Sequence, residues 1–258
     1  MPKLRLIFFE WEINLEPLTF IATNLDLVMS SSLIALLQKY AAAISPVVPI
    51  DLNSSQVCRL DFTAANNLLK HKDLRNTAAF NQLVSEMLAA QNATVGIGGY
   101  LENRTIYNRS THFAEQEEKR SVHLGVDIWA EALTPVFSPL AGRVHSFRDN
   151  ANFGDYGPTI ILEHELEGQT FYTLYGHLAQ TSLTSLYPGK PIAKGETIAQ
   201  LGPFPENGNW PPHLHFQVIT GMLGMEGDFP GVCTPQQQDR FAQLCPNPNL
   251  LLHCHYLQ

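Results

Sequence analysis

The 258-residue sequence has few cysteines, little basic charge and no long hydrophobic run. Its four cysteines are widely spaced and form no CxxC pair, at Cys58, Cys233, Cys245 and Cys254. This spacing excludes a small disulfide-rich fold and predicts free thiols. The net charge of −8 leaves no basic footprint for nucleic acid. No apolar run approaches the roughly 18 residues that span a bilayer, so no membrane span is expected.

The N-terminus also lacks the pattern of a secretory signal. Residues 1–9 combine a basic start with four apolar residues, but Glu10 and Glu12 interrupt this run before it reaches the length of a signal-peptide core. The sequence as it stands therefore predicts a cytoplasmic protein. It carries no signal for an oligomeric state.

Two segments alternate histidine or aspartate with apolar or small residues. Residues 121–129 read SVHLGVDIW, and residues 212–216 read PHLHF. Successive side chains of a strand point to opposite faces, so every second side chain shares a face. His213 and His215 are therefore expected to point the same way.

His123 and Asp127, four residues apart, would also share a face of a strand. A fully extended strand would set their Cα atoms roughly 13 Å apart, too far to bind one ion comfortably, but Gly125 between them allows a bend. Two imidazoles and a carboxylate form a ligand set that suits zinc, and a catalytic zinc keeps its fourth position open. One histidine of the later segment is then left over, placed to act as an acid or a base.

The N-terminal third of the chain has helical periodicity. Apolar residues recur at helical spacing over residues 25–43, 61–69 and 76–90, which predicts a small helical N-terminal domain at residues 1–95. The glycine-rich residues 95–99 lack the lysine of a phosphate-binding loop and are expected to form a tight turn.

The rest of the chain has the pattern of a β protein. Short runs interrupted by Gly and Pro lie at residues 134–139, 141–147, 159–164, 170–175, 190–199 and 213–219. They predict an all-β antiparallel sandwich or partly open barrel at residues 96–225, with a hairpin at Glu167-Gly168. Residues 226–258 are expected to be an irregular tail packed on the core. The expected fold class is α+β.

Three motifs in the later part of the chain occur in the order found in one enzyme family. HLGVD at residues 123–127, YGHL at 175–178 and PHLHF at 212–216 resemble the motifs of the lysostaphin-type (LAS) zinc metalloendopeptidases of bacterial cell walls. The resemblance covers roughly residues 120–220 and includes the TPV segment at residues 134–136.

The resemblance implies that His123, Asp127 and His215 bind one Zn²⁺ per chain. It also implies that His177 and His213 line the cleft as unligated catalytic histidines. The expected reaction is hydrolysis of a peptide bond in peptidoglycan, either in a glycine bridge or in a D-amino-acid stem link. The family acts in the periplasm or cell envelope. This location does not match the cytoplasmic protein that the missing signal peptide predicts.

The expected mechanism uses zinc to polarise the scissile carbonyl and to lower the pKa of water towards neutrality. His213 or His177 would take the water proton, and the pair would stabilise the oxyanion and protonate the leaving amine. Which histidine does which is left open. The other histidines, such as His145 and His164, are expected to be ordinary core or surface residues.

Some features depart from the family pattern. Gln217 stands where an acidic residue is common, so an amide is expected to support one ligand. Tyr156 and Trp210 are candidates for contact with a peptide or peptidoglycan substrate, although core packing explains them equally well.

Two alternatives remain open for the function. One is a binding or regulatory module that uses the same groove without hydrolysis. The other is a latent enzyme, in which the N-terminal domain or residues 103–108 lie over the cleft and an Asn or Tyr takes the open zinc position.

Overall fold

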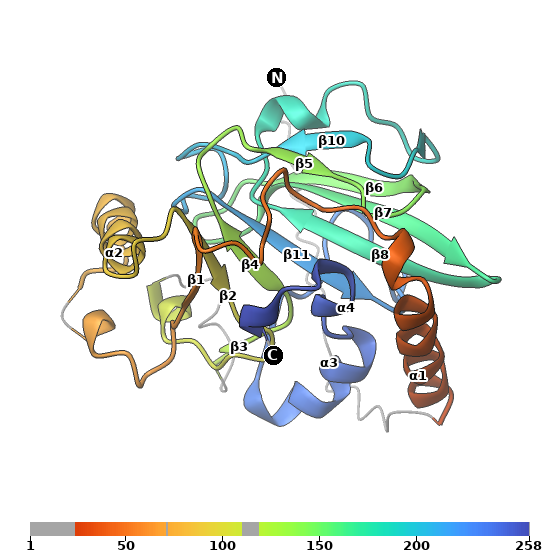
Figure 1. Ribbon diagram of the computed structural model, residues 1–258, viewed down its shortest axis with the longest axis horizontal. Coiled ribbons are helices and arrows are strands. Elements are labelled where there is room, and N and C mark those ends of the chain that lie inside the picture. Colours follow the sequence, from red (N-terminus) through yellow and green to blue (C-terminus); the bar gives the residue numbers. More distant parts are fainter. Residues whose placement is uncertain (1–23, 71, 110–118, 258) are drawn as a thin grey trace, which may run out of the picture.

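The computed structural model describes residues 24–70, 72–109 and 119–257. These residues form one eight-stranded mixed sheet in the order β1-β2-β4-β11-β8-β7-β6-β9 (Figure 1). Its strands are β1 (Val57–Leu60), β2 (Val95–Gly98), β4 (Val126–Trp129), β11 (His213–Ile219), β8 (Gln169–Gly176), β7 (Gly157–Leu166), β6 (Gly142–Asn150) and β9 (Pro191–Ile192). All neighbours are antiparallel except β1 and β2, which run parallel.

Two short strand pairs and four α-helices complete the described fold. The pairs are β5 (Pro135–Phe137) with β10 (Thr197–Gln200), and β3 (Val122–His123) with β12 (Val232–Cys233). The helices are α1 (Asn24–Lys39), α2 (Thr77–Ala89), α3 (Gln238–Leu244) and α4 (Asn249–Leu252). Short 3-10 helices lie at Ala41–Ala43, Asn67–Leu69, Ile106–Arg109, Gln180–Leu183, Pro235–Gln237 and His255–Leu257. No helix among the described residues is long and apolar enough to cross a membrane.

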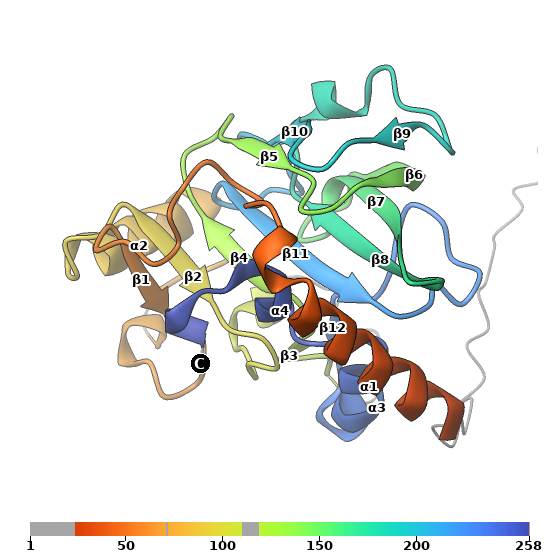
Figure 2. The ribbon, with the colours of Figure 1, turned by 45° about the vertical axis from the view of Figure 1, so that its right-hand side comes forward.

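One face of the large sheet packs in the hydrophobic core, and the other face carries the predicted site residues. Val126 and Ile128 of β4 belong to the largest hydrophobic cluster, together with Leu33 of α1 and Leu251 of α4. Figure 2 shows α1 beside α3 and α4. The alternate residue Asp127 points to the other face, because successive strand side chains alternate. We call this second face the site face.

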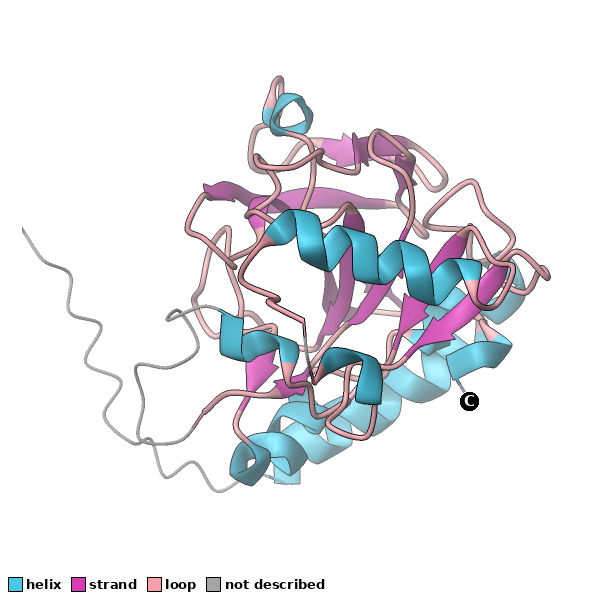
Figure 3. Ribbon diagram, turned by 90° about the vertical axis from the view of Figure 1, so that its left-hand side faces the viewer, coloured by secondary structure: helices cyan, strands magenta, loops and turns pink. Residues whose placement is uncertain are grey.

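Two smaller hydrophobic clusters pack on the site face. One joins α2 to the end of the sheet through Phe80 and Trp129, and Figure 3 shows α2 in front of the strands. The other contains Leu244 of α3 and Ile219 of β11. Between these clusters lie the ends of β4 and β11, where the predicted site residues stand.

The small helical domain predicted for residues 1–95 is not confirmed, because its described part contains strands as well as helices. β1 and β2 belong to the large sheet, so residues 95–98 are a strand rather than a tight turn. Residues 61–69 form turns and a 3-10 helix instead of an α-helix. The reason is local, because the side chains of Asp61 and Asn66 accept hydrogen bonds from backbone N–H groups two residues ahead and so compete with helical bonds.

Other expectations agree with the structure. The helix predicted over 25–43 overlaps α1, which begins one residue earlier and ends at Lys39, and the helix predicted over 76–90 contains α2. The β7–β8 hairpin turns at Glu167 and Gly168, which both have positive φ, as a type I′ turn requires.

Two further expectations need correction. The antiparallel pairing predicted for residues 96–225 is present in the large sheet, but the described strands form one open sheet with β1 and β9 at opposite edges rather than a sandwich or a closed barrel. The C-terminal tail is not irregular, because it contains α3 and α4, and Leu251 of α4 is buried in the largest cluster. The limits given above for the three domains stay a prediction.

Candidate metal centre and catalytic cleft

Strand pairing sets His215 beside Asp127. In the register of β11 against β4, His215 is opposite Asp127 and His213 is opposite Trp129. Both residues of each pair lie on the site face. The later motif therefore presents both of its histidines to the face where Asp127 stands, as strand alternation predicted.

A bend at Gly125 brings His123 to the same place. β3 ends at His123 and β4 begins at Val126, so the chain is not one extended strand. A Cβ at Gly125 would lie 2.6 Å from the ring of His215 and 2.8 Å from the carbonyl oxygen of Phe216. Only glycine leaves room for this close approach.

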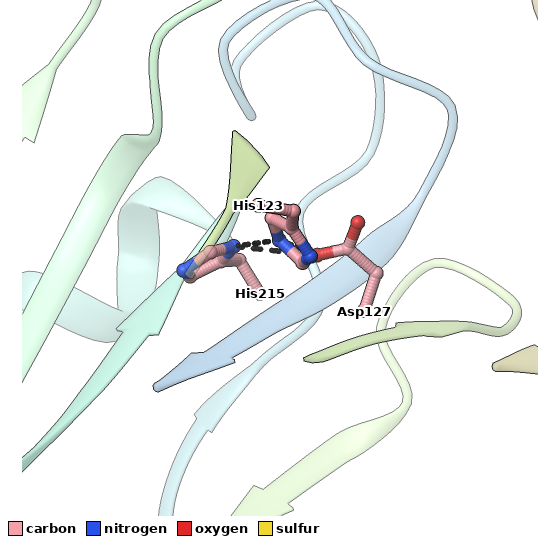
Figure 4. A group of neighbouring side chains, drawn as sticks. All are labelled: His123, Asp127 and His215. Carbon is pink, nitrogen blue, oxygen red and sulfur yellow. Dashed lines mark hydrogen bonds and ion pairs between the residues drawn. The ribbon is translucent and has the colours of Figure 1, made fainter. Parts of the chain in front are cut away.

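Three side-chain atoms converge at this point (Figure 4). His123 Nε2 lies 3.0 Å from His215 Nδ1 and 3.2 Å from Asp127 Oδ1, and His215 Nδ1 lies 3.3 Å from the same oxygen. Ligand atoms about 2.0–2.1 Å from a tetrahedral zinc are roughly 3.3 Å from one another. The three atoms therefore have the spacing of three corners of a zinc tetrahedron.

The outer hydrogen bonds of the two histidines show that both facing nitrogens carry lone pairs. His123 Nδ1 lies 3.0 Å from the carbonyl oxygen of Gly99. His215 Nε2 lies 2.9 Å from Oε1 of Gln217, whose Nε2 donates to the carbonyl of Pro230. Since both outer partners are oxygens that only accept, each ring has its proton on the outer nitrogen. His123 Nε2 and His215 Nδ1 then have no hydrogen to share.

Asp127 adds a third electron-rich atom. Its Oδ1 is buried and has no hydrogen-bond partner among the described residues, whereas Oδ2 accepts a short hydrogen bond from Nη1 of Arg104. Burial would raise the pKa of the Asp127 carboxyl, but the charge of Arg104 acts in the opposite direction, and the pKa lies well below its usual range. The carboxylate is therefore ionised at neutral pH, and a cation is the partner that satisfies all three atoms.

His177 and His213 stand next to this group. Their ring centroids are 4.2 Å apart, and His213 stacks on Trp129 at 4.0 Å with an interplanar angle of 14°. Nδ1 of His177 lies 2.9 Å from the carbonyl oxygen of Asn207, and Nδ1 of His213 lies 2.8 Å from that of Pro211. Both Nδ1 atoms therefore donate, and both Nε2 atoms are free to accept a proton.

Burial keeps these histidines neutral. It lowers the pKa of His213 to about 4, and it holds the pKa of His177 well below the usual range, with neighbouring His213 as a further cause. His123, also buried, has a pKa lowered to about 4. At neutral pH the imidazoles are thus in the form that binds a metal or takes a proton. His177 also has a positive φ of 61°, a strained conformation that is concentrated at functional sites.

A cleft of about 440 Å³ opens beside this cluster and is lined by Tyr156 and Trp210, among others. The Tyr156 hydroxyl lies 3.5 Å from His215 Nε2. Trp210 donates from Nε1 to the carbonyl of Asp155 and packs edge-on to His177. Both predicted substrate contacts thus border the cleft, and both are also packed against their neighbours, so their role stays a prediction.

The structure brings all five histidine and aspartate residues of the predicted site together. It also adds two residues that the sequence did not single out as partners of the ligands, Arg104 and Gly99. Both belong to the segment before the first motif, and no spacing rule links them to it. The latent alternative places residues 103–108 over the cleft, with an Asn or Tyr at the open zinc position. Ile106 and Tyr107 of this segment do line the cleft. However, the Tyr107 hydroxyl lies 3.4 Å from Nη1 of Arg104, and Asn103 is exposed.

Comparison with known proteins gives one family. Residues 121–225 match the model of peptidase family M23. A solved zinc containing peptidase from Vibrio cholerae is 27% identical over 38% of this chain and 27% of that chain, with a TM-score of 0.30. A putative peptidase M23 from Pseudomonas aeruginosa is 19% identical over 51% of this chain and 44% of that chain, with a TM-score of 0.34.

The catalytic domain of the antimicrobial peptidase lysostaphin from Staphylococcus simulans is 24% identical over 45% of this chain and 77% of that domain, with a TM-score of 0.33. The matches thus span less than half of the Vibrio and Pseudomonas chains. The search of curated proteins found no match. The residues matched by the family model contain all five histidine and aspartate residues of the site.

Proposed function

Residues 121–225 form a domain of peptidase family M23, and from this premise we propose that the chain is a zinc-dependent endopeptidase. The observation that carries the proposal is the convergence of His123 Nε2, His215 Nδ1 and Asp127 Oδ1. These three atoms have lone pairs, lie 3.0–3.3 Å apart and are buried. Without a cation they would repel one another, and a two-histidine, one-carboxylate set suits zinc.

The residues around these three ligands hold the two unligated histidines, His177 and His213. Zinc, when bound, supplies Lewis acidity that polarises a carbonyl and makes water acidic near neutral pH. The carbonyl oxygens of Asn207 and Pro211 accept from Nδ1 of His177 and His213, two residues that line the cleft, which would leave Nε2 of each ring to take and return a proton. Trp129 holds the His213 ring by stacking.

The substrate we propose is a peptide bond in peptidoglycan, in a cross-link or a stem peptide. Tyr156 and Trp210 would contact the peptide along the cleft wall. Apolar side chains such as Phe229 and Met225 line the same cleft, which excludes water and strengthens the polar contacts of a bound peptide.

The test measures zinc content and cleavage in the same variants. His215→Ala is expected to lose the metal and all activity. His177→Ala and His213→Ala are expected to retain about one zinc per chain but to lose turnover by roughly 10²–10⁴-fold, the usual contribution of a positioned acid or base. His145→Ala, a half-buried histidine on β6 outside the cluster, is the control and should behave as wild type.

Cleavage is measured as the release of new amino groups from purified peptidoglycan and from synthetic bridge and stem peptides. Loss of zinc from His177→Ala would contradict its unligated role. A zinc-loaded wild type that binds peptidoglycan but releases no amines would favour the binding module. If Tyr107→Ala, which opens the cleft wall, then switches cleavage on, the chain is a latent enzyme. That outcome has a basis in the structure, since all five site side chains are at most 6% exposed.

A further inference from the structure

Residues 101–104, which precede the family-matched residues in the chain, are hydrogen-bonded to the backbone of residues 121–123. The backbone N–H of Leu101 donates to the carbonyl of His123, and His123 N–H donates to the carbonyl of Glu102. Arg104 N–H donates to the carbonyl of Ser121. These bonds fix residues 101–104 against β3, the strand that ends at His123, so their side chains reach the site from one defined direction.

Arg104 is the side chain of this segment that reaches a proposed ligand. Its side chain is 1% exposed and bonds to two carboxylates: Nη1 donates to Asp127 Oδ2, and Nε donates to Glu102 Oε2 at 2.7 Å. The guanidinium also lies over the ring of Phe62, 5.5 Å from its centroid. A buried arginine with two carboxylates and an aromatic face is held in one position.

The neighbouring strand leaves space for this guanidinium. Gly98 of β2 is opposite Asp127 in the sheet register. A Cβ at Gly98 would lie 2.6 Å from Nη2 of Arg104, closer than non-bonded atoms allow. The absence of a side chain at Gly98 therefore matches the position of Arg104, and the two belong to one arrangement around Asp127.

We propose that Arg104 is a positioning residue that makes Asp127 a one-oxygen ligand of the metal. A free carboxylate can bind a metal through both oxygens. Here Arg104 holds Oδ2, so only Oδ1 faces His123 and His215, and a zinc held by these residues would take a single oxygen from Asp127. This inference rests on the proposed zinc site and extends the metal centre to a residue outside the family-matched region.

Glu102 makes this arrangement compatible with a dication. Its carboxylate balances the charge of Arg104, so the buried pair is neutral as a unit and does not repel the metal as a lone guanidinium would. Glu102 Oε1 is buried and has no hydrogen-bond partner among the described residues, so its carboxylate depends on Arg104. The pair therefore adds directional hydrogen bonds to Asp127 without adding net charge.

The experiment compares Arg104→Met and Arg104→Lys with wild type. Zinc affinity is measured by competition with a chelating dye, and coordination by the visible absorption of Co²⁺ added in place of zinc. For Arg104→Met we expect zinc affinity to fall by about 10–100-fold, as for other residues that support a ligand. We also expect a weaker Co²⁺ absorption, because Asp127 can then bind through both oxygens and raise the coordination number. Arg104→Lys should recover part of the affinity.

The matched control is Arg143→Met. Arg143 also pairs with a strand carboxylate, Glu163, but at the surface, where its side chain is 62% exposed. This variant should bind zinc and Co²⁺ as wild type does. If Arg104→Met does not fold, the double variant Arg104→Met with Glu102→Gln removes one of the two stranded charges and is measured instead.

Two outcomes would overturn the inference. One leaves the proposed function intact, and the other contradicts it as well. If wild type binds zinc and a folded Arg104 variant has the same affinity and the same Co²⁺ spectrum, Arg104 does not position the ligand and the proposed function still stands. If wild type itself does not bind zinc or Co²⁺, the proposed function and this inference fail together.

Discussion

His164 is a buried histidine on β7, outside the site, whose surroundings make stability depend on pH. Nδ1 lies 3.0 Å from the carbonyl of Ala141, and Nε2 lies 2.7 Å from Oγ1 of Thr173. Burial lowers the pKa of His164 to about 4, although the Ala141 carbonyl acts in the opposite direction. In the unfolded chain its pKa is about 6.5, so between pH 6.5 and 4 the unfolded state takes up a proton that the folded state does not.

The stability linked to His164 is therefore complete above pH 6.5 and falls as the pH is lowered towards 4. We expect a loss of about 2–3 kcal/mol in the free energy of unfolding between pH 7.5 and 4.5 from this residue. Urea unfolding of the metal-free wild type and of His164→Gln at both pH values measures this loss. The other buried histidines contribute equally to the wild type and to the variant, so the difference between the two proteins comes from His164. The variant should lose less stability on acidification. His253→Asn, at an exposed residue with positive φ that asparagine tolerates, is the control. An equal loss in wild type and His164→Gln would contradict the assignment.

Single residues also mark the limit of what the sequence could tell. The alternation around Asp127 and in PHLHF predicted a shared face, because strand geometry is local. Arg104 could not be found this way, since its role depends on backbone bonds between residues 101–104 and β3, which only the folded chain brings together. His177 came from the family resemblance alone, and its positive φ and its bond to Asn207 became visible only in the structure.

Among the elements, α2 is linked to the site through aromatic rings. Phe80 is fully buried and lies edge-on to both Trp129 and Trp210, at 5.8 and 6.0 Å between centroids. Trp129 in turn stacks on His213. Phe80→Ala is expected to lower the free energy of unfolding by about 3–5 kcal/mol, as for other buried phenylalanines. It should also reduce turnover, because the stacked position of His213 loses its support.

Leu83→Ala separates these two effects. Leu83 is also fully buried on α2 in the same cluster, and its truncation is expected to cost about 2–5 kcal/mol. Turnover is measured for both variants at a temperature where circular dichroism shows each to be folded. We expect Phe80→Ala to be slower than Leu83→Ala. Equal turnover in the two variants would show that α2 serves stability alone.

The elements that the sequence predicted well are those with their own local signals. α2 begins after Asn76, whose side chain accepts from the N–H groups of Ala78 and Ala79, the capping pattern of a helix start. β1 has no such signal. Its four residues become a strand by parallel pairing with residues 95–98, a contact between segments almost forty residues apart, which local periodicity does not contain.

On the scale of the whole molecule, the described N-terminal residues are part of the main structure. Leu33 and Leu37 of α1 are fully buried in the largest cluster, which also contains Leu252 near the C-terminus. β1 forms one edge of the eight-stranded sheet. Figure 1 shows these segments packed around the same sheet that carries the site. An N-terminal part of this kind does not behave as a detachable cover.

Removal of residues 1–92 is therefore expected to unfold the protein rather than to expose the cleft. The deletion removes six fully buried side chains, Leu33, Leu37, Leu60, Phe62, Phe80 and Leu83, each of which contributes about 1.5–3 kcal/mol. Their sum is comparable with the 5–15 kcal/mol net stability of a typical domain. We expect the full chain to unfold in one transition, with the same midpoint by circular dichroism and by tryptophan fluorescence, and residues 93–258 to show neither transition nor zinc binding. If that fragment instead unfolds cooperatively and binds zinc, the catalytic part folds on its own, and the N-terminal residues then become a candidate for regulating access to the cleft.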